Sequence, residues 1–273
     1  MANHTATAAG AIAIVAQDSS CRGYVSNLRV RIYRPAAQRS APPLAIYLHP
    51  GRFMAGDLDA ADATGRALAA RLGLAVIAPA YSLASEQPFP AAAEDAYAAL
   101  AWAQAYAAQG EWNARHIAVF GEEAGGNLAA VVAMMARDRG GPALAAQILI
   151  APMLDPSLSS CSMRASDPKA TRCDEAYQRY LPHAADRLHP YAAPALCTRL
   201  AGLAPALILT AQDDPLRDEA ESYGAKLVTA GVKTQVTRLP MRGWCEAMWL
   251  EITHFLKPLL VPARIGHDPS FIG

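Results

Sequence analysis

The chain has 273 residues, of which 53% are hydrophobic and 18% are charged, so it can bury a large core and does not have the composition of a disordered protein. Lysine plus arginine and aspartate plus glutamate both total 24, and this balance argues against nucleic acid or an anionic membrane as the partner. No apolar run reaches the ~18 residues that a membrane span needs.

The N-terminal segment 1–20 is rich in alanine and lacks a basic stretch before its apolar residues. It is interpreted as a frayed lead-in rather than a signal peptide, and a cytoplasmic location is expected. The five cysteines are odd in number and lack the close spacing of a zinc site, so neither a metal nor a cofactor is expected. Free thiols are expected, with a Cys161–Cys173 or a Cys173–Cys197 bridge as the alternative.

The expected elements alternate between strands and helices along the chain. The alternation of apolar and polar residues in 28–35 predicts a half-exposed strand near a sheet edge, ended by a proline. The further strands are predicted at 44–50, 74–81, 116–121, 145–154, 205–214 and 233–240. Helices are predicted at 59–73, 88–110, 127–141, 217–231 and 244–260. Near-continuous apolar strands between helices predict one α/β domain over 1–273, with a mostly parallel sheet covered on both faces.

Residues 155–200 break this alternation, because they are polar, rich in proline and serine, and show only short helical patches. A segment of this length inside a compact domain is more often functional than not. We therefore expect a small lid or cap inserted between two strands, with a surface excursion of no function as the alternative.

Six short motifs occur in order along the chain: VRIYRP at 30–35, YLHPGRF at 47–53, YSLASEQPFPAAAEDAYAALAW at 81–102, GEEAGGNLAA at 121–130, DDPLRDEA at 213–220 and PMRGW at 240–244. Together they resemble the hormone-sensitive-lipase branch of the α/β-hydrolase esterases, over roughly residues 27–260. The resemblance implies the α/β-hydrolase fold, with a strand, a sharp turn and a helix presenting a nucleophile in a G-x-S-x-G pattern.

The resemblance also assigns the site residues. Glu123 stands at the family's nucleophilic serine, Arg242 at its histidine, and Asp214 at its acid, with Asp213 as the alternative by one position. The oxyanion-loop and pocket positions fall on His49, Gly51, Arg52, Phe53 and Ala124. Pro50 has no amide hydrogen, whereas Gly51, Arg52 and Ala124 keep theirs.

These replacements conflict with ester hydrolysis of the family type, which needs a hydroxyl nucleophile and a base that takes its proton. A guanidinium stays protonated at any ordinary pH, so Arg242 cannot be that base. A carboxylate nucleophile at Glu123 would form an intermediate that still needs an activated water. The opposite charges instead predict an ion-pair network of Glu123, Arg242 and Asp214, with unpaired charges left by sequence drift as the alternative.

The main functional hypothesis is a catalytically inactive member of the esterase family that binds a small molecule, acidic or ester-like, or a protein partner. The alternative is an atypical but active carboxylester hydrolase. A structural or regulatory role, with a homodimer formed through the last strand and helix, is a third hypothesis. A Cys245–His49 pair is a further candidate for chemistry, although a packed thiol and a loop-orienting histidine are the simpler interpretation.

Overall fold

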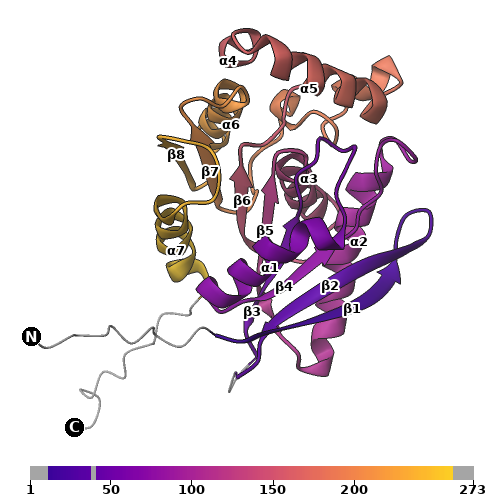
Figure 1. The fold of residues 1–273 in the computed structure, drawn as a ribbon, viewed down its shortest axis with the longest axis vertical. Helices are drawn as coiled ribbons and strands as arrows, with labels where there is room; N and C mark the ends of the chain where they lie inside the picture. The colour runs from indigo at the N-terminus through magenta and orange to yellow at the C-terminus, as the bar shows by residue number, and fades with distance from the viewer. Residues whose placement is uncertain (1–11, 38–40, 261–273) are drawn as a thin grey trace, which may run out of the picture.

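The computed structural model describes residues 12–37 and 41–260, and Figure 1 shows their arrangement. Eight strands form one sheet in the order β1-β2-β4-β3-β5-β6-β7-β8. The strands are β1 Ile14–Arg22, β2 Asn27–Pro35, β3 Pro43–Leu48, β4 Ala75–Pro79, β5 Asn113–Glu122, β6 Leu144–Ile150, β7 Ala206–Ala211 and β8 Thr234–Leu239. The pairs from β4 through β3 to β8 are all parallel, and only β1–β2 and β2–β4 are antiparallel. The predicted mostly parallel sheet is confirmed.

The first strand was not predicted. The N-terminal segment was interpreted as a frayed lead-in, but its residues Ile14–Arg22 pair along their whole length with β2, while residues 1–11 lie outside the described part of the chain. Only Cys21 of this strand is buried, because β1 is an edge strand that covers little of the core. Such a strand carries no continuous apolar run, so its sequence lacks the signal that identified the inner strands.

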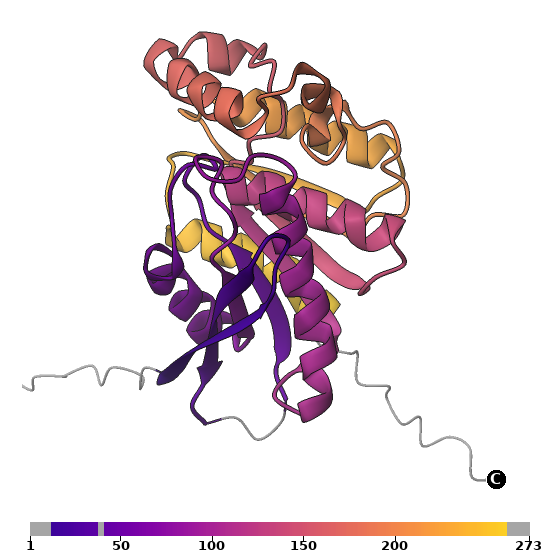
Figure 2. The ribbon, with the colours of Figure 1, turned by 90° about the vertical axis from the view of Figure 1, so that its right-hand side faces the viewer.

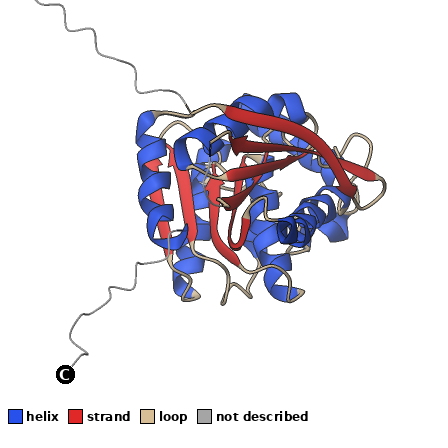
Figure 3. Ribbon diagram, turned by 90° about the horizontal axis from the view of Figure 1, so that it is seen from below, coloured by secondary structure: helices blue, strands red, loops and turns tan. Residues whose placement is uncertain are grey.

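Helices cover both faces of the sheet, as Figure 3 shows from below. The strand residues alternate between two cores: Leu44, Ile46 and Leu48 of β3 face one core, and Ala45 and Tyr47 face the other. The first core also contains side chains of α2 Ala91–Tyr106, α3 Ala124–Asp138 and α6 Arg217–Thr229. The second contains side chains of α1 Leu58–Leu72 and α7 Glu246–Leu260. A short 3-10 turn, η1 Ala107–Gln109, follows α2.

The boundaries of α1 follow from its sequence. Asp57 accepts hydrogen bonds from the amides of Asp59 and Ala60, which otherwise lack partners in the first turn. At the other end Gly73 has a φ of 65°, which closes the helix in the left-handed conformation that glycine adopts without strain. The predicted helix at 59–73 is thereby confirmed.

Residues 155–200 connect β6 to β7 through short elements: α4 Cys161–Arg164, α5 Asp167–Tyr180, η2 Ala184–Leu188 and η3 Pro194–Leu196. Figures 1 and 2 both show α4 and α5 beyond one end of the sheet, at the top of the molecule. Whether this segment acts as a lid stays a prediction.

Two sequence-level expectations concern the whole chain. All five cysteines lie in described residues and are free thiols, so the two alternative bridges are absent. No helix between residues 12 and 260, leaving aside 38–40, combines the length and apolar character of a membrane span.

Candidate active-site pocket

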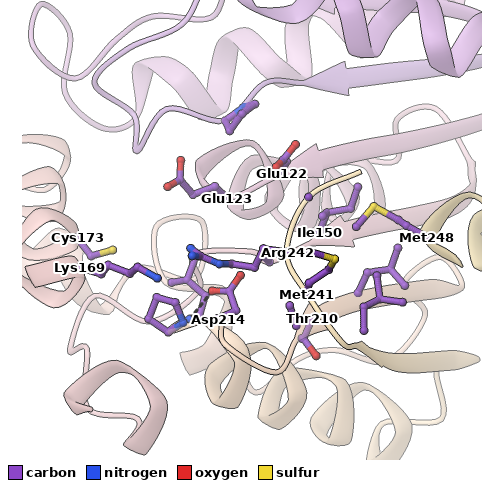
Figure 4. A pocket seen from close by; sticks show the side chains of 18 of the residues that line it. Glu122, Glu123, Ile150, Lys169, Cys173, Thr210, Asp214, Met241, Arg242 and Met248 are labelled. Carbon is purple, nitrogen blue, oxygen red and sulfur yellow. Dashed lines mark hydrogen bonds between the residues drawn. The ribbon is translucent and has the colours of Figure 1, made fainter. Parts of the chain in front are cut away.

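A pocket of about 460 Å³ opens at the carboxyl ends of β5 to β8, the edge of a parallel sheet where sites form. Figure 4 shows the side chains that line it. Four of the predicted site residues lie in its wall: Arg52, Glu123, Asp214 and Arg242. The sequence therefore selected positions that the fold brings together from four distant segments.

Glu123 occupies a sharp turn between β5 and α3. Its φ of 55° and ψ of −113° are strained for a residue with a side chain, and strain of this kind clusters at functional sites. The turn is held by backbone bonds, because the Glu123 amide donates to Ile150 and its carbonyl accepts from Met153. A side chain on Gly125 would lie 2.0 Å from the carbonyl oxygen of Leu48, so only glycine permits this close crossing of helix and strand.

The loop after β3 also has unusual backbone geometry. Gly51, Arg52 and Phe53 have φ values of 137°, 51° and 61°, three positive values in succession. The amides of Met54 and Ala55 both donate to the carbonyl of Gly51, which closes the loop on itself. This conformation turns the amides of Gly51 and Arg52 toward the elbow at Glu123.

The carboxylate of Glu123 is bound by that loop. Its Oε2 accepts from the amide of Gly51 at 2.9 Å and from the amide of Arg52 at 3.1 Å. Its Oε1 pairs with the Arg52 guanidinium at 3.3 Å. The loop expected to face an anion does so, and the anion is the protein's own side chain.

The expected network of Glu123, Arg242 and Asp214 is wrong. Glu123 pairs with Arg52, and Arg242 donates through Nε to Asp213 at 3.3 Å. Arg52 is favoured because it belongs to the loop whose amides already hold the carboxylate. Asp213 and Arg242 are both about half exposed, so their pairing requires little loss of hydration.

Asp214 is buried and lines the pocket next to this exposed pair. Burial raises the pKa of its carboxyl group, opposed by a hydrogen bond from the Leu216 amide and by the charges of Arg242 and Lys169. The Leu216 bond uses Oδ1 at 2.9 Å, and no hydrogen bond to Oδ2 is recorded within the described ranges.

The remaining predicted residues support the loop instead of lining the pocket. His49 is buried, stacks on Tyr81 at 4.2 Å between ring centroids, and has its pKa lowered mainly by burial. Phe53 is buried and stacks on Tyr180 of α5 at 3.8 Å. Ala124 is buried at the start of α3, and no bond from its amide to the Glu123 carboxylate is found among residues 12–37 and 41–260.

The alternative pair of Cys245 and His49 is not formed. Cys245 packs against the core beneath α7, whereas His49 stacks on Tyr81, which belongs to the core on the other face of the sheet. The described part of the chain also holds no cluster of three histidine, cysteine or acidic residues suited to a metal ion.

Some residues that line the pocket were not predicted from the sequence. Lys169, Arg172 and Cys173 of α5 line the pocket, and their spacing of three and four residues places them on one helix face. Glu122 also lines it, accepting a hydrogen bond from the Trp244 indole at 3.1 Å, and burial raises the pKa of this carboxyl group. The i, i+3, i+4 pattern within 155–200 is the signal that could have found the α5 residues.

Comparison with known proteins identifies the family. A family model described as alpha/beta hydrolase fold matches residues 45–245. The chain belongs to the α/β-hydrolase fold family. Esterase LipI of Mycobacterium tuberculosis is 38% identical over 226 residues, covering 80% of this chain and 71% of the relative. The ethyl acetate hydrolase of Pseudomonas putida is 36% identical, covering 78% and 69%.

Solved α/β-hydrolases agree with this assignment. A bacterial heroin esterase superposes with a TM-score of 0.84 at 30% identity, covering 91% of this chain and 85% of the other. An esterase from Pyrobaculum calidifontis gives a TM-score of 0.78 at 38% identity, covering 82% and 75%. The resemblance to the esterase family drawn from six motifs is confirmed.

A buried acid next to the pocket leads to a prediction about pH. Oε1 of Glu219 in α6 accepts from the amide of Leu154 at 2.7 Å, while its Oε2 is buried with no hydrogen-bond partner in the described residues. Burial raises the pKa of this carboxyl group from 4.5 to about 8. The native state therefore keeps a proton that the unfolded chain releases between these two values.

The pKa of Glu219 is higher in the folded protein than in the unfolded chain. Its contribution to the free energy of unfolding is therefore fully present below pH 4.5 and is lost as the pH rises toward 8. We expect Glu219→Gln, which keeps the acceptor and cannot ionise, to become more stable relative to the wild type over this range. At roughly 1.4 kcal/mol per pKa unit the gain amounts to a few kcal/mol. Urea unfolding at several pH values measures it, with the exposed Glu86→Gln as control. A difference between the Glu219 variant and the wild type that does not change with pH would contradict the assignment.

Proposed function

We propose that this member of the esterase family binds a small molecule in the pocket and does not turn over esters by the Ser-His-Asp reaction. The observation that carries the proposal is the Glu123 carboxylate on the amides of Gly51 and Arg52. In acyl transfer, donors in this place stabilise the oxyanion that develops on the substrate carbonyl. Here a fixed negative charge occupies them and would repel that oxyanion.

The side chains at the nucleophile and base positions also argue against ester turnover. Glu123 offers no hydroxyl to attack an ester, and Arg242 remains a cation that cannot accept its proton. Attack by the carboxylate itself would use one oxygen, which would have to leave two amides if it is Oε2 or Arg52 if it is Oε1. The resulting intermediate would then need a general base to activate water, and no histidine lines the pocket within the described residues.

Active carboxylester hydrolysis is the second candidate. The relatives, which include proteins named esterase and carboxylesterase, support it better than they support loss of activity. Asp214, the acid that the family resemblance implies, also lines the pocket, together with Arg52 of the loop after β3. A protein partner or a homodimer, expected from the sequence, stays a prediction.

Hydrolysis of p-nitrophenyl butyrate by homogeneous protein separates the two candidates. We expect a rate for the wild type no higher than for Glu123→Ala, because removing a non-reacting carboxylate removes no catalysis. Multiple turnover by the wild type that Glu123→Ala abolishes, with both proteins folded, would establish the second candidate and overturn the first.

A further inference from the structure

We propose that the pocket binds an aliphatic carboxylate, whose charged end lies among Lys169, Arg172 and Arg242 and whose chain lies against the apolar half of the wall. This proposal rests on the binding function proposed above and names the chemical class of the ligand.

Two of the three cations come from α5. Lys169 and Arg172 lie three residues apart and both line the pocket. Lys169 is half-buried and Arg172 is exposed, and neither forms a hydrogen bond or ion pair through its side chain with any described residue. Other cations of the described residues, such as Arg139 on Glu94 and Arg238 on Glu221, have a carboxylate partner. The two α5 side chains therefore present charge to the pocket that the protein does not neutralise.

Arg242 enters the same space from the loop after β8. In Figure 4 the ends of Lys169 and Arg242 point toward each other from opposite walls, near Asp214. Both charges are near enough to lower the pKa of the Asp214 carboxyl group, against the effect of its burial. An anion placed between two like charges relieves the repulsion between them.

The acidic residues of the wall do not cancel this charge. Glu123 is already held by two amides and Arg52, and Glu122 accepts from Trp244. Asp214 is a single carboxylate near Arg242 and Lys169, and burial opposes its ionisation. The partner of Arg242, Asp213, lies at 3.3 Å in an exposed pair that an incoming carboxylate can replace.

The opposite half of the pocket is apolar. Figure 4 shows Ile150, Met241 and Met248 on the side of Arg242 away from Lys169. Leu209 and Leu239 are further apolar residues of the wall. A volume of about 460 Å³ falls within the range of small-molecule sites. An inorganic anion would leave the apolar half unused, whereas a carboxylate with an alkyl chain matches both halves.

Isothermal titration calorimetry with octanoate tests the proposal, using acetate and octan-1-ol as matched probes that each lack one half of the ligand. We expect octanoate to bind at least about tenfold more tightly than either probe, because only octanoate satisfies both halves of the pocket. The double variant Lys169→Ala/Arg172→Ala should weaken octanoate binding at least about tenfold. Arg179→Ala removes an exposed cation of the same helix that does not line the pocket, and it should leave the affinity unchanged.

Octanoate binding that equals octan-1-ol binding, or that survives the double variant, would overturn the assignment of the carboxylate to these cations. No octanoate binding by a protein that also fails to hydrolyse esters would overturn this inference and leave the loss of turnover standing. Ester turnover dependent on Glu123 would overturn the proposed function itself, and the hydrolysis assay measures that independently of any binding.

Discussion

The double variant Glu123→Ser/Arg242→His is expected to hydrolyse p-nitrophenyl esters. The serine hydroxyl is shorter than the glutamate side chain, so it leaves the amides of Gly51 and Arg52 free for a developing oxyanion. A histidine at 242 supplies the missing base, and Asp214 lies in the same pocket with Oδ1 engaged by Leu216. General-base catalysis contributes about 10²–10⁴ in rate, so at least a hundredfold gain over either single variant is expected.

Steady-state kinetics of the wild type, both single variants and the double variant give the comparison. Adding Asp214→Asn to the double variant should remove most of the gained rate, since Asp214 orients the new histidine. A double variant that melts like the wild type and remains inactive would contradict the prediction. It would mean that the loop amides do not stabilise an oxyanion at position 123 or that Asp214 does not orient the new histidine.

Gly125→Ala is expected to prevent or severely weaken folding. In an open helix this substitution stabilises by about 1 kcal/mol. At Gly125 the added Cβ would lie 2.0 Å from the Leu48 oxygen, 2.5 Å from the Leu48 carbonyl carbon and 2.6 Å from the His49 oxygen, all of them backbone atoms. Because no side chain can move aside, the start of α3 must separate from β3, and a loss above about 4 kcal/mol is expected.

Thermal and urea unfolding of the soluble protein measure this effect, and the yield of folded protein reports it when too little is recovered. Gly140→Ala is the matched control, since a Cβ there meets nothing within 4 Å although its φ is 60°. Gly140→Ala should lower the free energy of unfolding by only about 1–2 kcal/mol, because alanine is disfavoured in the left-handed backbone conformation of this position. Equal losses in the two variants would show that the crossing of α3 over β3 accommodates the added Cβ at little cost, which would contradict the prediction.

The inner part of the fold could be predicted because its strands are apolar on both faces and its helices have clear ends, as at Gly73. The edge strand β1 escaped prediction because it buries only Cys21. The site positions came from motifs with fixed spacing in the family. The ion-pair partners could not be predicted from such motifs. The sequence suggested Arg242 as the partner of Glu123, whereas the loop conformation with three positive φ values brings Arg52 to the Glu123 carboxylate.

The α5 residues show a second limit of the same kind. The composition of 155–200 does not indicate which face of its helices meets the pocket. In α5 that orientation is fixed by the burial of Tyr177 and Tyr180, which belong to the same helix. Once that orientation is known, the placement of Lys169, Arg172 and Cys173 follows from helical spacing alone.

The rings of Phe53 and Tyr180 are nearly parallel, with 4° between their planes, and they join the loop that binds Glu123 to α5, a helix that lines the pocket. Phe53 directly follows Arg52 in the chain, so a displacement of α5 large enough to part the rings also removes the support behind the two donating amides. Displacement of α5 and release of the Glu123 carboxylate are consequently linked events. Whatever fixes the position of α5 also strengthens the hold on that carboxylate, by the reciprocity that governs any two coupled equilibria.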